Sequence, residues 1–254
     1  MKSRRIGVMA LVAGAALCAP DAARAQDPPT VRTVSGKAYE GEHLALVDSS
    51  TPLYTLSVTI EKSPGVDRMQ VVDFDRSGAN FFTQTIDFDG ASPKGYAFSN
   101  SVANQTGKLT VSSTELVMEL TEGGKTKVSR EARPTLFAVG PSVTRLVEQH
   151  VADLSAGRTV VFSMVVVNRL ATYSFRAIRE PASSSEPIQQ IKSGQWMRVR
   201  IEPDSGIARI FAPKIVSIVD ARTGQTLAVN GPIPSPSADG GIIKGGTIRY
   251  EGFR

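Results

Sequence analysis

The stretch that decides the fold class is YTLSVTIE, residues 54–61. Its apolar side chains alternate with polar ones, so Tyr54, Leu56, Val58 and Ile60 share one parity. In a strand this spacing places the apolar side chains on one face and the polar ones on the other. The pattern is typical of an antiparallel sheet that packs one face on a core and leaves the other in water.

Similar segments follow at the regular spacing of an all-β fold. The strands expected are 37–47, 54–61, 68–74, 80–88, 95–99, 108–112, 114–121, 125–130, 159–167, 170–179, 195–202, 207–211, 214–220, 225–229 and 246–252. The segment TVVFSMVVV, residues 159–167, is apolar on both parities and predicts a strand buried on both faces. EPASSSEP, residues 180–187, and GPIPSPSADGG, residues 231–241, are expected to be loops because their prolines cannot donate to a sheet.

One segment has a helical pattern instead: PSVTRLVEQHVADLSAG, residues 141–157. Its apolar side chains form a single stripe of 3.6-residue period, made of Val143, Leu146, Val147, Val151 and Leu154. Ser142 is a candidate N-cap, and Gly157 is a candidate residue for the left-handed turn after the helix. The apolar stripe must cover the inner face of the sheet.

The first 25 residues have the features of an export signal: a basic start, an apolar run and the ending Ala23-Arg24-Ala25. The apolar run is shorter than the roughly 20 residues that span a bilayer. A retained membrane anchor is the alternative. SRRIG, residues 3–7, also resembles part of a twin-arginine signal.

Composition excludes several classes of function. The only cysteine is Cys18, inside the expected export signal, so thiol catalysis, disulfides and thiolate metal sites are excluded for the exported chain. The formal net charge is +5, and most of it lies in the export signal. The remaining basic residues form no patch with stacking aromatics, so we expect no nucleic-acid partner.

Two motifs resemble ligand loops. DFDRSG, from Asp73 to Gly78, copies the start of a calcium loop, but its twelfth position is Gln84 instead of a bidentate glutamate. EGGKTK, residues 122–127, ends like a phosphate loop but lacks the first glycine, because residue 119 is Glu119. Both are expected to be hairpin turns, and we expect no metal and no cofactor.

The histidines, His43 and His150, come from separate segments, and no motif of a known hydrolase occurs after the export signal. His150 borders the apolar stripe of the helix, where a histidine at the edge of a core is the simpler interpretation.

The second half of the chain, about residues 135–254, resembles an uncharacterised family of exported proteobacterial proteins. The resemblance rests on the helix followed by LSAGRTVVFSMVVVNRLATYSFR, on APKIVSIVDARTGQTLAVNGP and on TIRYEGFR, with a looser similarity in YEGEHLAL. The family implies no residue roles. Its layout is similar to periplasmic proteins in which a half-open antiparallel barrel, lined by a helix, holds lipid or a lipid anchor.

We therefore expect a mainly β fold of the α+β kind: an antiparallel, strongly curved sheet or half-open barrel with one principal amphipathic helix at about 142–156. The expected organisation is an export signal at 1–25, a flexible leader at 26–35 and one domain at 36–254. That domain has a first β half at 36–131 and a second at 158–254.

The expected function is non-catalytic binding of a lipid or hydrophobic small molecule between helix and sheet, in the periplasm or secreted beyond it. The residues expected to bind the ligand are Leu146, Val147, His150, Val151, Leu154, Phe162, Met164 and Tyr173. A plain closed core would use the same residues. The alternatives are an envelope assembly module that binds another protein, and a hydrolase, for which His150 or His43 is the first candidate.

Overall fold

The structure is a computed structural model that describes residues 30–41, 51–183, 186–205, 214–237 and 241–251. The described chain is mostly β, as the sequence predicts. The strands of its first half are β1 (Thr30–Glu40), β2 (Tyr54–Ser63), β3 (Val66–Phe74), β4 (Asn80–Asp89), β5 (Ser92–Asn100), β6 (Gln105–Val111), β7 (Glu115–Glu122) and β8 (Lys125–Ala132). Those of its second half are β9 (Phe137–Val139), β10 (Val160–Val166), β11 (Ala171–Glu180), β12 (Trp196–Pro203), β13 (Ile215–Asp220), β14 (Thr226–Pro234) and β15 (Ile242–Tyr250).

The alternation in β2 has the predicted result. Tyr54, Leu56 and Val58 are only 1%, 3% and 8% exposed, whereas Thr55 between them is exposed. The side chains of one parity are therefore buried, and those of the other parity reach solvent. We call the buried side the inner face of the sheet and the other side the outer face.

All described strands belong to one sheet, in the order β8-β7-β6-β5-β4-β3-β2-β1-β15-β14-β13-β12-β11-β10-β9. Neighbouring strands are antiparallel except β9 and β10, which are parallel. The strand β9 is absent from the sequence-based expectation. The first and the last strand of the described chain pair in the middle of the sheet, with Gly36 opposite Tyr250.

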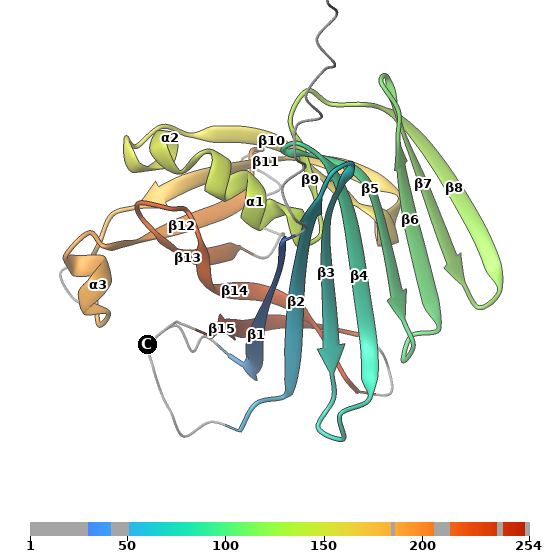
Figure 1. The fold of residues 1–254 in the computed structure, drawn as a ribbon, viewed down its shortest axis with the longest axis horizontal. Helices are drawn as coiled ribbons and strands as arrows, with labels where there is room; N and C mark the ends of the chain where they lie inside the picture. The colour runs from blue at the N-terminus through green and yellow to red at the C-terminus, as the bar shows by residue number, and fades with distance from the viewer. Residues whose placement is uncertain (1–29, 42–50, 184–185, 206–213, 238–240, 252–254) are drawn as a thin grey trace, which may run out of the picture.

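The sheet is strongly curved but does not close, which confirms the predicted half-open barrel. Strands β1–β8 and strands β10–β15 cross at a steep angle (Figure 1). The open edges are β8 and β9. The β8 end of the sheet comes close to β11 of the second half. Glu131 of β8 accepts hydrogen bonds there from the hydroxyl and the backbone N–H of Thr172 in β11.

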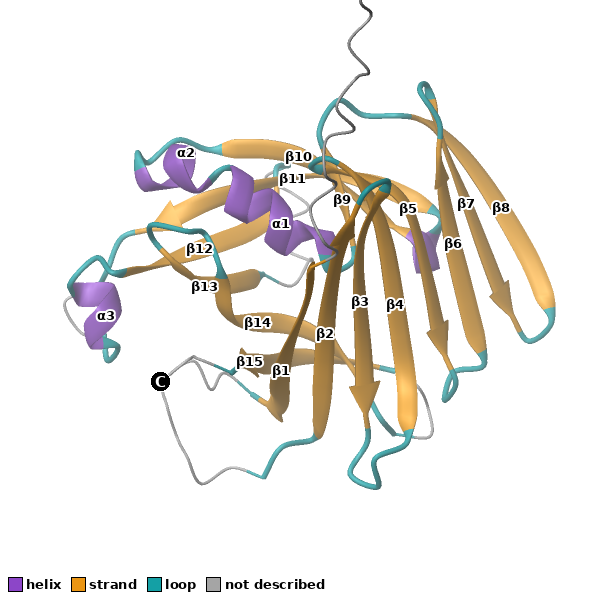
Figure 2. Cartoon of the chain, viewed as in Figure 1, coloured by secondary structure: helices purple, strands orange, loops and turns teal. Residues whose placement is uncertain are grey.

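The predicted helix is present but broken into α1 (Ser142–Gln149) and α2 (Val151–Ser155). Helix α1 reaches toward the region where the two halves of the sheet cross, and α2 lies beside β10 and β11 of the second half (Figure 2). His150 between them has φ −101° and ψ 17°, which departs from helical geometry. Gly157 has φ +77° and ends the helix in the left-handed conformation, as predicted.

Ser142 does not cap the helix, contrary to the prediction. It is the first helical residue, and its hydroxyl accepts a hydrogen bond from the Val139 N–H at 2.8 Å instead. Since residues 137–139 form a short strand that leads straight into the helix, the serine hydroxyl bonds the end of that strand. This contact holds β9 against α1.

Two hydrophobic clusters fill the inner face of the sheet. The first lies on β1–β7 and also includes Phe137 and Val139 of β9. The connection between β10 and β11 contains the short helix η1 (Val167–Arg169), and Val165 and Val167 from this hairpin belong to the same cluster. The second joins α1 and α2 to β10–β13. A third, smaller cluster lies on the outer face, where α3 (Gln189–Lys192) contributes Ile191 and packs with Trp196 and Ile218. The sequence analysis did not predict α3.

Arg145 of α1 links the helix to the first half of the sheet. Its guanidinium forms two parallel hydrogen bonds with Asp67 of β3, at 2.8 and 2.5 Å, and stacks 4.2 Å from the ring centre of Phe88. Both partners are largely shielded, with side-chain exposures of 15% and 22%. Paired bonds of this kind are among the stronger polar contacts in proteins. The helix therefore packs on the second half of the sheet and is fastened to the first.

The turn between β13 and β14 lies in close contact with the helix at its break. A Cβ atom added to Gly224 would lie 2.6 Å from the Cα of Glu148, and Gly224 has φ +74°. Only glycine fits here, because any side chain would collide with the helix backbone.

The structure corrects several boundaries. Residues 30–35, expected in a flexible leader, are part of β1 and pair along β2. Residues 231–234, expected in a loop, continue β14, where the ladder shifts register between Gly231 and Ile233 next to Pro232. Strand β10 is not buried on both faces throughout, because Val161 is 51% exposed. The expected export signal, His43, strand 207–211 and residues 26–29 lie outside the described residues.

The hairpins expected at the two ligand-like motifs are confirmed. Strands β3 and β4 pair antiparallel, and the Asp75 carboxylate closes their turn by accepting hydrogen bonds from the Ser77 N–H, the Ser77 hydroxyl and the Ala79 N–H. Strands β7 and β8 turn through Gly123 and Gly124, which both have positive φ.

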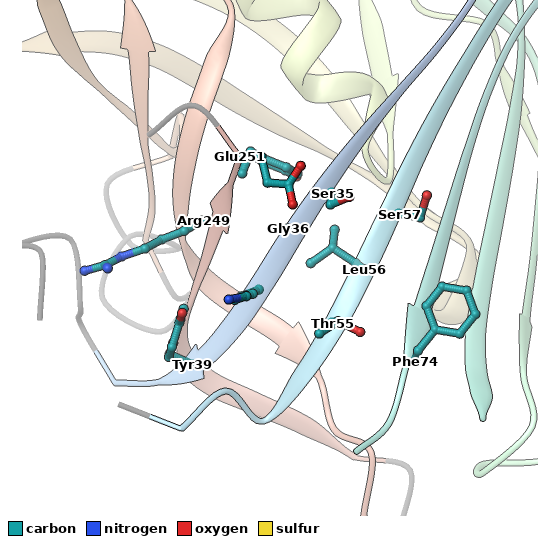
Figure 3. A pocket seen from close by; sticks show the side chains of 11 residues that line it. Ser35, Gly36, Tyr39, Thr55, Leu56, Ser57, Phe74, Arg249 and Glu251 are labelled. Carbon is teal, nitrogen blue, oxygen red and sulfur yellow. The ribbon is translucent and has the colours of Figure 1, made fainter. Parts of the chain in front are cut away.

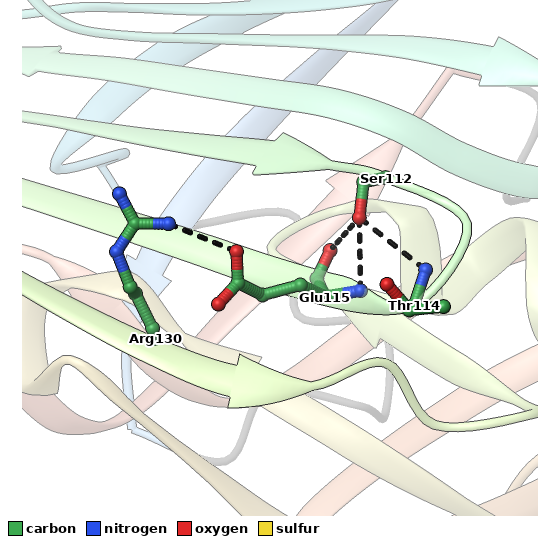
Figure 4. A network of polar contacts seen from close by, with 4 residues as sticks. All are labelled: Ser112, Thr114, Glu115 and Arg130. Carbon is green, nitrogen blue, oxygen red and sulfur yellow. Dashed lines mark hydrogen bonds and ion pairs between the residues drawn. The ribbon is translucent and has the colours of Figure 1, made fainter.

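Strand β8 forms a backbone ladder along one edge only, with β7. At its far end, Arg130 pairs with Glu115 of β7 at 2.9 Å, and the Ser112 hydroxyl organises the preceding turn by accepting from the Thr114 and Glu115 N–H groups (Figure 4). No described strand pairs with its other edge. In the described ranges no helix is long and apolar enough to cross a membrane.

Candidate functional site

The residues predicted to bind a ligand mostly form a packed interior. Leu146, Val147 and Leu154 of the helix are 4%, 1% and 0% exposed. They share a cluster with Phe162 and Met164 of β10, as predicted, and with Met197, Val199, Ile201 and Val219 of the sheet behind. Val151 lies at the margin of this cluster. Neither of the two cavities described below includes any of these residues, so ligand binding between helix and sheet stays a prediction.

Tyr173 is not part of the cluster that the helix residues share with the sheet. It is the cross-strand partner of Met164 and so shares its face, yet it is 48% exposed. The reason is its place near the start of β11. The helix covers the opposite end of this strand, where Arg179 donates to the Ser155 carbonyl at 2.9 Å.

His150 lies at the helix break with a side chain that is 28% exposed. Its Nδ1 is 3.0 Å from Asp153, and hydrogen bonds from His150 and Arg158 lower the pKa of that carboxyl. Within the described chain, the His150 ring contacts this carboxylate, and no hydroxyl bonds the ring. His43 lies outside the described residues.

The larger of the two cavities is an open groove of about 500 Å³ where the two halves of the sheet meet, at the β1–β15 pair (Figure 3). We call it the seam groove. It is lined by Ser35, Gly36, Lys37, Tyr39, Thr55, Leu56, Ser57, Phe74, Arg249, Tyr250 and Glu251. The strand register places Lys37, Thr55, Phe74 and Arg249 together on the outer face, so the groove runs across the outside of β15, β1, β2 and β3. No local sequence pattern marks this site, because the β1–β15 pair joins the two ends of the described chain.

Two cationic residues of neighbouring strands line the seam groove. Lys37 of β1 and Arg249 of β15 are direct cross-strand partners, and the Arg249 guanidinium lies 5.5 Å from the ring centre of Tyr39. Like charges directly opposite each other on neighbouring strands destabilise a sheet. Lys37 forms no ion pair within the described chain, and the groove's one carboxylate belongs to Glu251 at its rim.

A buried carboxyl lies on the other side of the same strands. Asp73 of β3 is the cross-strand partner of Leu56 and is only 3% exposed. Burial raises the pKa of Asp73 to about 7. The hydroxyl of Tyr54 is also buried and has no hydrogen-bond partner among the described residues.

Burial and the nearby Asp73 raise the pKa of both Tyr54 and Tyr250. Since Tyr250 also lines the seam groove, the buried acid and the groove share one residue. An acid without a charged partner in an apolar interior is a common mark of functional sites.

A second cavity of about 290 Å³ lies on the outer face of the second half, beside Glu186 and Arg198. Arg198 donates two hydrogen bonds to Glu186, at 2.8 and 2.9 Å. Burial alone would raise the pKa of Glu186, but the bonds from Arg198 and the Ile188 N–H hold it below its usual value. Arg176 pairs with the buried Glu202 in the same row of strands. The arginines beside this cavity are paired with glutamates of the same chain, which indicates that these residues have a structural role.

No candidate metal centre is present in the described ranges, where no three histidine, cysteine, aspartate or glutamate side chains gather.

Comparisons with known proteins give a fold neighbour and no function. No protein-family model matches the sequence, and no curated protein matches it. Among solved structures, the chain is similar to a beta-barrel-like protein of the domain of unknown function DUF1849 from Brucella abortus. The two chains are 9% identical, with a TM-score of 0.40, over 87% of this chain and 95% of that chain. A likeness of this degree bears on neither ligand nor activity.

Proposed function

We propose that this chain is a non-catalytic binding protein of the bacterial periplasm that holds an anionic amphiphile, such as a fatty acid, in the seam groove. The ligand class is the hydrophobic or lipid ligand expected from the sequence. Its place moves from the helix–sheet interface to the β1–β15 seam, because the helix residues are packed into a cluster with the sheet.

The observation that carries the proposal is the facing pair Lys37 and Arg249. A carboxylate or phosphate between them removes the repulsion of two adjacent cations and gains charge-assisted hydrogen bonds. Arginine suits such groups because its planar fork can donate two parallel hydrogen bonds. Tyr39, stacked with Arg249, restricts where that fork points.

The apolar part of the ligand finds the Phe74 ring, which is on the outer face next to Thr55. Leu56 and Tyr250 also line the groove, but they have the inner-face parity and flank Gly36, which has no side chain of its own. A volume of about 500 Å³ is within the range of small-molecule sites in proteins. The groove therefore offers a charged end and an apolar end to one elongated molecule.

Periplasmic location is part of the proposal and is supported by the basic, apolar and small-residue segments of residues 1–25. The measurement is immunodetection in periplasmic and cytoplasmic fractions of the native host, and a signal confined to the cytoplasm contradicts this part.

The test of binding is a titration with a fluorescent long-chain fatty acid. We expect Lys37→Ala and Arg249→Ala each to weaken binding about tenfold, since one hydrogen bond to a charged group contributes about 1.5–3 kcal/mol. The control is Lys108→Ala, which removes an exposed cation of β6 outside the groove. A fatty alcohol of the same chain length should bind the wild type about as weakly as the acid binds the variants.

Two outcomes contradict the proposal: no saturable binding by the wild type, or equal loss of affinity in Lys108→Ala and the groove variants. Lipid extraction from protein purified out of its own host adds the identity of a resident ligand.

A second role, as an assembly module of the cell envelope, is favoured by one feature, the unpaired edge of β8. Exposed strand edges are used to add a strand from another chain.

A further inference from the structure

The outer edge of β8 carries free backbone groups whose positions follow from the β7–β8 hairpin. The hairpin turns through two glycines with positive φ, so the flanking residues Glu122 and Lys125 form a hydrogen-bonded pair. Hydrogen-bonded and non-bonded pairs then alternate along the strands. Arg133 agrees with this alternation: as an odd-numbered residue like Lys125 it points its N–H toward β7, where it donates to the Thr114 carbonyl at 2.8 Å.

It follows that the N–H and C=O groups of Thr126, Val128 and Arg130 point away from β7. All three residues are exposed, and Val128 is 56% exposed. No described strand accepts these groups. Exposed edges normally bear charges that discourage pairing, and β8 carries Lys125, Lys127 and Arg130. These charges oppose some registers of pairing with another strand and favour others.

We propose that β8 pairs antiparallel with the β8 of a second copy of this chain, about a two-fold axis through Val128. In this register Val128 faces its own copy, Thr126 faces Arg130, and Lys125 faces Glu131. The bonded pairs then use the outward groups of residues 126, 128 and 130, as the hairpin phase requires.

The side chains favour this register over its neighbours. Lys125 and Glu131 form a non-bonded pair, in which opposite side chains approach most closely, and the symmetry makes two such pairs. Glu131 accepts hydrogen bonds from the Thr172 hydroxyl and N–H but has no ion pair within the described chain, and a carboxylate has lone pairs left for a further donor. Arg130, by contrast, is already matched by Glu115. Centring the axis on Lys127 instead would set Lys127 opposite itself, and centring it on Thr126 would set Lys125 opposite Lys127. Both place like charges directly opposite each other.

The contact is self-complementary, which is what a two-fold dimer needs. It joins two sheets into one continuous sheet and buries two valines that are otherwise in water. Its area is that of a single strand pair, so the dimer is weak and forms at high concentration.

The test uses single cysteines in a Cys18→Ser background, which removes the chain's only native cysteine. In the proposed register the two Val128 Cα atoms are about 5.5 Å apart, within the range that a disulfide spans. We expect Val128→Cys to form a covalent dimer under mild oxidation. Thr126→Cys alone is the matched control and should stay monomeric, since residue 126 faces residue 130 of the other copy. A mixture of Thr126→Cys and Arg130→Cys should form the mixed dimer.

Sedimentation of the unmodified protein between about 1 and 200 µM gives the second readout, a concentration-dependent shift from monomer to dimer. Val128→Pro, which removes one outward N–H and leaves the β7 pairing intact, should abolish that shift while the melting temperature holds. The proposal is overturned if Val128→Cys stays monomeric, if Thr126→Cys cross-links equally well, or if Val128→Pro dimerises like the wild type.

Discussion

Replacing Asp73 with asparagine should make the protein more stable at neutral pH, by an amount that depends on pH. The carboxyl is 3% exposed, and burial raises its pKa to about 7, compared with 3.8 for an exposed aspartate. Below about pH 4 it is protonated in both the folded and the unfolded chain and has no effect. Between about pH 4 and 7 only the unfolded chain ionises, so the free energy of unfolding falls as the pH rises.

The size of the effect follows from the shift of roughly three pKa units. At about 1.4 kcal/mol per unit, the folded state loses about 4 kcal/mol by pH 8. An asparagine side chain keeps the shape of the aspartate without its charge, so Asp73→Asn should lack this loss. The variant and the wild type should then differ little at pH 4 and by up to about 4 kcal/mol at pH 8.

The assay is urea unfolding at pH 4, 5, 6, 7 and 8, followed by circular dichroism, for the wild type and Asp73→Asn. Asp89→Asn is the matched control, because Asp89 is an exposed carboxylate at the end of the neighbouring strand β4. We expect its stability curve to run parallel to that of the wild type. If the free energy of unfolding of Asp73→Asn runs parallel to that of the wild type between pH 5 and 8, the Asp73 carboxyl does not have a raised pKa in the folded state. That result would refute the reasoning.

Two further substitutions test the packing of the helix. Gly224→Ala should destabilise the protein more than Gly157→Ala, by about 1–3 kcal/mol, because both glycines have positive φ but only at Gly224 would the new Cβ meet the helix backbone. Equal losses in thermal unfolding would show that the turn does not press on the helix. Arg145→Met should cost about 2 kcal/mol, since it leaves the shielded Asp67 without its partner, whereas Arg130→Met, at an exposed pair, should cost well under 1 kcal/mol. Equal costs in urea unfolding would contradict the role of Arg145 as a link between the two halves.

Local patterns predicted the parts of the fold that local physics determines. The alternation from Tyr54 to Ile60 gave a half-buried strand, and the stripe from Val143 to Leu154 gave the helix and the cluster that it covers. The apolar segment 137–139 gave no signal of a strand, because three residues are too few to show a period. The N-terminal part of β1 was missed because Val31 and Arg32 are both exposed, so only backbone pairing with β2 places them in the sheet.

The candidate site was harder to predict, because its parts come together only through long-range pairing. Lys37 and Arg249 become neighbours through the β1–β15 register, which nothing near either residue encodes. Asp73 did carry a signal: it shares the parity of Met69 and Val71, which are buried. The sequence analysis considered that aspartate only as part of a calcium loop, since a carboxylate on a buried parity is rare.

The pairing of β1 with β15 has a consequence for the order of events in folding. Strands β2–β8 are joined by short turns, as are β10 to β11 and β13 to β14, so much of each half can form from local contacts. The seam between them needs contacts across about 200 residues, and closing so long a loop is slow. The two meanders are therefore expected to form first and the seam last. A ligand that occupies the seam groove would then bind only the finished fold, and would hold the two meanders together by mass action.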